Sequence, residues 1–64
     1  MLNEVAVYAK LTKVHLSLMK RGDVTNAMLI ANVMAELAAD FNDRTDGDLG
    51  KEAAEFAANH LQWV

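Results

Sequence analysis

The sequence predicts an all-α fold, a three-helix antiparallel bundle built on an α-hairpin and completed by homodimerisation. Proline is absent, glycine occurs only three times, and good helix formers dominate the 64 residues. Apolar residues recur with helical spacing in three segments, which are separated by breaks only at Gly22 and at residues 43–50. A chain of this length permits one domain, residues 1–64.

The first predicted helix covers residues 3–21 and ends at a glycine. Lys20 and Arg21 complement the negative carboxyl end of the helix dipole. Gly22 is suited to the left-handed position that follows many helices. The helix is therefore expected to end beside this glycine.

The second predicted helix covers residues 24–41 and starts almost immediately afterwards. Asp23 or Thr25 can cap its amino end, because a short polar side chain there accepts a hydrogen bond from a free backbone N–H. A connection as short as "RGD" requires the two helices to run antiparallel.

The third predicted helix covers residues 48–63, with Asp46 or Asp48 as its cap, and it follows the acid-rich stretch "DFNDRTDGDLG". That stretch does not fit a calcium loop of the EF-hand type. Placing Gly47 at the required glycine puts Arg44 at the third position and Ala53 at the twelfth, where oxygen ligands are needed. The acids are therefore interpreted as helix caps, and no metal or cofactor is predicted.

The predicted helices carry more apolar surface than one short chain can cover. Hydrophobic residues form 53% of the chain, and alanine, which adds little area, supplies 11 of them. The second helix has a bulky apolar side and a separate side of small residues that permits close backbone approach. We therefore expect self-association across a two-fold axis, through a second apolar stripe of the first helix or through a set of residues on the second helix and near the carboxyl end. That set is Ala27, Ala31, Ala35, Ala38 and Trp63.

Charge is distributed unevenly along the chain. Residues 1–22 hold four basic residues against Glu4, whereas residues 23–50 hold six acids against Arg44, and the whole chain has a net charge of −3. The four basic residues share an arc of roughly 100° on the first helix, which is suited to an acidic protein surface or to phosphates. They are Lys10, Lys13, Lys20 and Arg21. A helix-turn-helix is disfavoured, because the expected connection of residues 42–47 is long for that motif.

His15 and His60 are the two histidines, and both fall within apolar arcs of their helices. With Glu4 they supply the ligand types of a zinc or iron site if the first and third helices bring them together. No single helix contains two of these residues at metal-binding spacing. A structural role for the two histidines is therefore favoured over metal binding. A metal- or ligand-binding bundle stays an alternative.

No catalytic residue is predicted. Ser17 is the only serine, and it has no histidine on its face and no glycine-rich turn to present it. No signal peptide is recognised at the amino end, and the longest apolar window is too short for a bilayer, so a cytoplasmic location is expected.

The function expected from the sequence is that of a non-enzymatic, homo-oligomeric protein-interaction module, a small bacterial or phage accessory or regulatory factor that binds another protein. The alternative is a small nucleic-acid-binding regulator that uses the basic stripe of the first helix.

Overall fold

A computed structural model describes residues 3–60 of the chain. They form three α-helices, α1 (Glu4–Lys20), α2 (Val24–Thr45) and α3 (Leu49–His60), and no strand is present in this part of the chain. The prediction of an all-α three-helix bundle is confirmed. Within residues 3–60, no helix combines the length and the apolar character that crossing a membrane would require.

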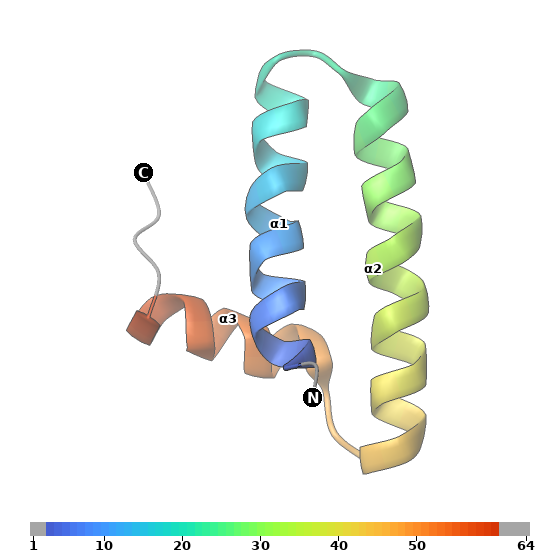
Figure 1. Ribbon diagram of the computed structural model, residues 1–64, viewed down its shortest axis with the longest axis vertical. Helices are drawn as coiled ribbons and strands as arrows, with labels where there is room; N and C mark the ends of the chain where they lie inside the picture. The colour runs from blue at the N-terminus through green and yellow to red at the C-terminus, as the bar shows by residue number, and fades with distance from the viewer. Residues whose placement is uncertain (1–2, 61–64) are drawn as a thin grey trace.

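The helices α1 and α2 lie side by side and antiparallel, whereas α3 crosses α1 near its start and runs away from α2 (Figure 1). At about 1.5 Å per residue, the 12 residues of α3 span about 18 Å and the 22 residues of α2 about 33 Å. One short helix laid across the hairpin therefore covers only part of it. Along the rest of the hairpin, α1 and α2 have only each other as neighbours among the described residues.

The turn between α1 and α2 follows the prediction closely. Gly22 has φ +77°, its N–H donates to the carbonyl of Met19, and the N–H of Asp23 donates to the carbonyl of Leu18. This pair of bonds is the Schellman arrangement that ends helices at a left-handed residue. Asp23 then caps α2, since its carboxylate accepts a hydrogen bond from the N–H of Asn26 at 3.2 Å.

The end of α2 was predicted wrongly. The helix continues to Thr45 rather than stopping at residue 41, and Asp46 follows it in the left-handed conformation with φ 59°. The extra turn is supported by Arg44, which pairs with Asp40 at 2.9 Å and with Glu4 of α1. This cross-helix pair favours the helical conformation of a segment whose own residues are moderate helix formers.

Asp48 caps α3, as one of the two predicted alternatives, because its carboxylate accepts a hydrogen bond from the N–H of Lys51 at 3.2 Å. Asp46 belongs to the end of α2 instead. The connection between α2 and α3 is therefore three residues, 46–48, and not the longer segment expected from the sequence.

The interior is small and consists largely of alanine. Ala9 of α1 packs against Ala53 and Ala57 of α3, and all three are at most 3% exposed. Alanine contacts let α1 and α3 approach closely but bury little area. The largest fully buried side chain is Leu49, the first residue of α3. Most bulky apolar residues consequently lie outside the core.

Candidate interaction surface

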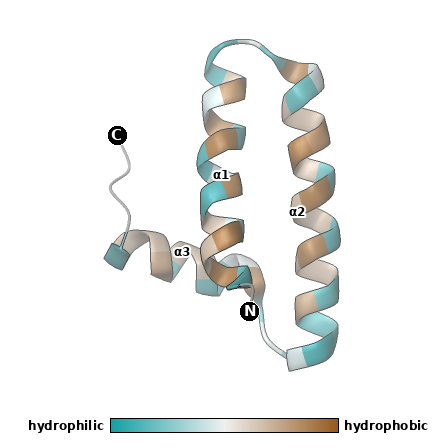
Figure 2. Cartoon of the chain, viewed as in Figure 1, coloured by the Kyte–Doolittle hydropathy of each residue, from teal (hydrophilic) through white to brown (hydrophobic). Residues whose placement is uncertain are grey.

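The most prominent surface feature is a set of large apolar side chains that are between 44% and 62% exposed. All of them lie on α1 and α2, where apolar residues continue along the hairpin beyond the level at which α3 crosses (Figure 2). They are Val14, Leu16, Met19, Val24, Met28, Leu29 and Val33. Large apolar side chains that stay exposed in a single chain are candidates for burial against another macromolecule.

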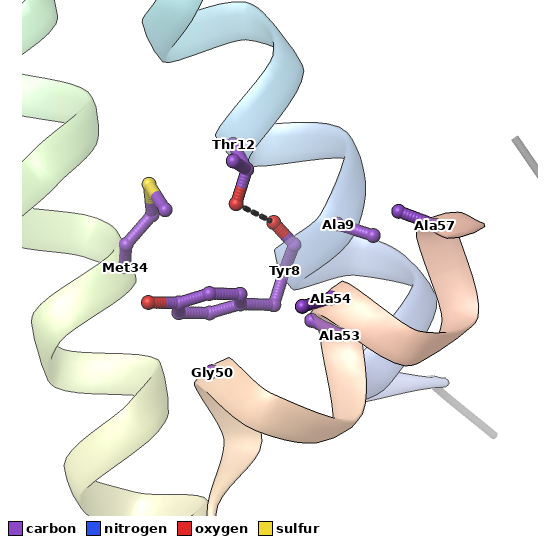
Figure 3. A pocket seen from close by; sticks show the side chains of 8 residues that line it. All are labelled: Tyr8, Ala9, Thr12, Met34, Gly50, Ala53, Ala54 and Ala57. Atoms are coloured by element: carbon purple, nitrogen blue, oxygen red, sulfur yellow. Dashed lines mark hydrogen bonds between the residues drawn. The ribbon is translucent and has the colours of Figure 1, made fainter. Parts of the chain in front are cut away.

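A hollow of about 250 Å³ lies where α3 meets the hairpin (Figure 3). The ring of Tyr8 extends from α1 toward Met34 of α2, and three alanines of α3 together with Gly50 form another wall. The hydroxyl of Thr12 donates to the backbone carbonyl of Tyr8 at 3.0 Å and is therefore already satisfied. Walls of alanine, methionine and a tyrosine ring offer apolar contact but no pair of groups for acid–base chemistry.

The hairpin has two distinct broad sides. Ala9 of α1 packs on α3. Successive residues of a helix are 100° apart, so Val7 and Val14 lie about 140° to 160° around α1 from Ala9. On α2, Asn42 bonds to α3, and Val33 and Leu37 lie about 140° to 180° around the helix from Asn42. Both helices therefore present apolar residues on the side away from α3. We call this surface the back face; it consists of Val7, Leu11, Val14, Ile30, Val33 and Leu37.

The predicted alanine surface of α2 lies mainly on the other side of the hairpin, facing Tyr8 and His15 of α1. Ala31 and Ala35 share a second hollow of about 250 Å³ with His15 and Tyr8. Ala35 is exposed, while Ala31 and Ala38 are half-buried.

One member of the predicted surface is not exposed. Ala27 is only 1% exposed in the single chain, because it faces α1 inside the hairpin, so it is not part of any free surface. Trp63, the remaining member, lies outside the described residues.

The four basic residues of the predicted stripe, three on α1 and Arg21 directly after it, are all exposed. Arg21 lies 4.0 Å from Asp23 in the turn, at the limit of an ion pair. Lys10, Lys13 and Lys20 take part in no ion pair with another of the described residues 3–60. On α2 the complementary charges are Glu36 and Asp40, which are also exposed.

The turn between α2 and α3 is shorter than the sequence suggested. A connection of three residues is short enough for a helix-turn-helix, so the expected loop length no longer argues against that motif. However, the exposed face of α3 carries Glu52 and Glu55 against Lys51, which is unfavourable for a helix that must approach phosphates.

The two histidines lie in different surroundings. His15 is half-buried beside the hollow of Ala31 and Ala35, whereas His60 is exposed and the centroid of its ring lies 4.6 Å from that of the Phe56 ring. Across residues 3–60 there is no group of three histidine, cysteine, aspartate or glutamate side chains placed to hold a metal ion.

The acids around the second turn have structural contacts. Asp48 caps α3, Asp40 pairs with Arg44, and Asp46 supplies the left-handed residue after α2. The hydrogen bonds from Arg44 to Glu4 and then to Asp40 raise the pKa of Arg44 above its usual value. The link from Arg44 to Glu4 was not foreseen, because it joins residues forty positions apart and no local pattern indicates it.

No family model, curated protein or solved structure matches the chain.

Proposed function

We propose that this chain is a non-catalytic protein-interaction module that acts as a homo-oligomer in the cytoplasm, in the manner of a small accessory or regulatory factor. The observation that carries the proposal is the set of large apolar side chains left about half exposed on α1 and α2. Burying the exposed half of a valine, leucine or methionine contributes on the order of 1 kcal/mol, so each of these residues that a partner covers favours association.

The small core supports the same proposal. A chain of this size buries a limited share of its surface, and here the buried residues are mostly alanine. Association adds apolar burial that the single chain lacks, and it removes the exposed apolar residues from water.

Sedimentation equilibrium at micromolar protein concentration tests this proposal. The expected result is a mass of at least two chains together with a helical circular dichroism spectrum. A helical monomer over the whole concentration range would exclude the homo-oligomeric module.

The exposed cations of α1 and the three-residue turn before α3 support a second candidate, a nucleic-acid-binding regulator. Binding through Lys10, Lys13, Lys20 and Arg21 must weaken steeply with salt, because each phosphate contact releases counterions. A gel shift with duplex DNA at 50 and 200 mM salt distinguishes the candidates. A salt-sensitive complex supports the regulator, and no complex at either salt concentration removes it.

A further inference from the structure

We propose that two copies of this chain associate through the back face of the hairpin, with α1 of each copy lying antiparallel on α2 of the other. The inference rests on the proposed homo-oligomeric function and specifies the surface and the partner, which is a second copy. The resulting core is a four-helix arrangement of two hairpins, and each α3 lies on the outside.

The back face is apolar along most of the hairpin. Val14 is 44% and Val33 is 50% exposed, and Val7, Leu11, Ile30 and Leu37 are half-buried between them. α3 packs on the Ala9 side of α1, away from Val7 and Val14, and meets α2 near its end, where Leu49 bonds to Asn42. On the α3 side, by contrast, α3 itself occupies one end of the face and obstructs a second hairpin.

A shallow apolar hollow of about 280 Å³ runs along the back of α1 and is lined by Ala6, Val7, Lys10, Leu11 and Val14. Helices associate when a ridge of side chains on one fits a groove on the other. On the back of α2, Val33 and Leu37 are four residues apart and form such a ridge. The two helices of one hairpin therefore present a groove and a ridge that suit each other in a second copy.

Charge selects the orientation of the two copies. At the edges of the back face, α1 carries Lys10 and Lys13, and α2 carries Glu36 and Asp40. All four side chains are exposed. A two-fold axis parallel to the helices places α1 of one copy on α2 of the other. The lysines of each copy then lie next to the acids of the other, which is favourable. A two-fold axis in the plane of the hairpin but perpendicular to its helices would instead place α1 on α1 and α2 on α2. Like charges would then face each other, which is unfavourable.

The lysines of one copy and the acids of the other also lie at similar positions along the hairpin axis. Glu4 pairs with Arg44, and His15 lies beside Ala31, so these contacts show which residues of α1 and α2 lie opposite each other. Between them, Lys10 of α1 lies opposite about residue 37 of α2. A two-fold axis parallel to the helices preserves these positions. Lys10 and Lys13 of one copy consequently reach the level of Asp40 and Glu36 of the other.

Charge reversal followed by mixing tests this arrangement. One variant carries Lys10→Glu and Lys13→Glu, and the other carries Glu36→Lys and Asp40→Lys. Each variant alone has like charges on both edges, so we expect its self-association to weaken at least about tenfold. An equimolar mixture restores opposite charges at every edge, and we expect its affinity to return to within about threefold of the parent protein.

The readout is sedimentation of the parent, each variant and the mixture, with circular dichroism to verify helicity. Val33→Glu and Met28→Glu form a matched pair, since both residues lie on α2 and are at least half exposed, but only Val33 belongs to the back face. We expect Val33→Glu to dissociate the dimer and Met28→Glu to leave it intact.

The outcomes separate the two proposals. A monomeric parent protein would overturn the proposed homo-oligomeric function and this arrangement with it. A dimeric parent whose charge-reversed variants do not associate on mixing would overturn the arrangement alone. Dissociation by Ala35→Glu but not by Val33→Glu would assign the interface to the alanine surface on the α3 side instead.

Discussion

The side-chain oxygen of Asn42, near the end of α2, accepts a hydrogen bond of 2.8 Å from the backbone N–H of Leu49, the first residue of α3. Leu49 is fully buried. The bond satisfies one of the free N–H groups at the start of α3 and ties it to α2 across a three-residue turn. One polar contact next to one buried leucine therefore ties the start of α3 to the end of α2, while Ala53 and Ala57 pack on α1.

Asn42→Ala is expected to lower the free energy of unfolding by about 1 to 2 kcal/mol, because a buried or partly buried donor loses its partner. Urea unfolding followed by circular dichroism measures the change. Asn32→Ala is the matched control, since Asn32 is an exposed asparagine of the same helix, and its effect should stay within about 0.5 kcal/mol. Equal effects of both substitutions would contradict the role of Asn42.

Gly22→Val is expected to cost about 1 kcal/mol or more of unfolding free energy. A Cβ at this position meets no atom within 4 Å, so the cost arises from the positive φ alone. Gly22→Asn provides the comparison, because asparagine tolerates the left-handed conformation better than valine does. The expected order of stability in urea unfolding is glycine, then asparagine, then valine, and a valine variant as stable as the parent would be inconsistent with this turn.

Asp23 makes a side-chain hydrogen bond and a cap bond to Asn26, and these bonds hold its pKa below the usual value for an aspartate. A lowered pKa means that the ionised carboxylate stabilises the folded state at neutral pH. This contribution is lost as the pH falls through the lowered pKa. In Asn26→Ala, the pKa of Asp23 followed by NMR should rise toward its usual value. An unchanged pKa would show that Asn26 does not set it.

Calcium and chelators are expected to leave the melting temperature unchanged. Asp40 pairs with Arg44 and Asp48 caps α3, and within residues 3–60 no three acidic, histidine or cysteine side chains are placed to share an ion. A bound ion would stabilise the folded state as its concentration passed the dissociation constant. Thermal melting with 5 mM EDTA or 5 mM calcium gives the comparison, and a rise of several degrees with calcium would overturn the capping interpretation.

The local features of the fold could be predicted from sequence because short-range signals encode them. Gly22 ends α1, and Asp23 and Asp48, each one of two candidates given by the sequence, cap α2 and α3. The end of α2 was wrong because its last turn is supported by Arg44 and Glu4, which are far apart in sequence.

The candidate surface was only partly predictable for a similar reason. Helical spacing identified the alanine side of α2 and the exposed cations of α1. Helical spacing could not show which apolar residues α3 covers. That depends on the direction in which α3 crosses α1, and this direction is set by contacts between residues far apart in the sequence. Ala27 faces α1 and is buried, while Val33 faces away from α3 and is half exposed.

The dependence of the melting temperature on protein concentration tests self-association most directly. If folding and dimerisation share one equilibrium, a 100-fold increase in concentration stabilises the dimer by about 2.7 kcal/mol and raises its melting temperature by about 10 °C. Melting followed by circular dichroism from 1 to 100 µM should show this rise. A melting temperature that stays constant over that range, for a protein that sediments as a monomer, would contradict the account.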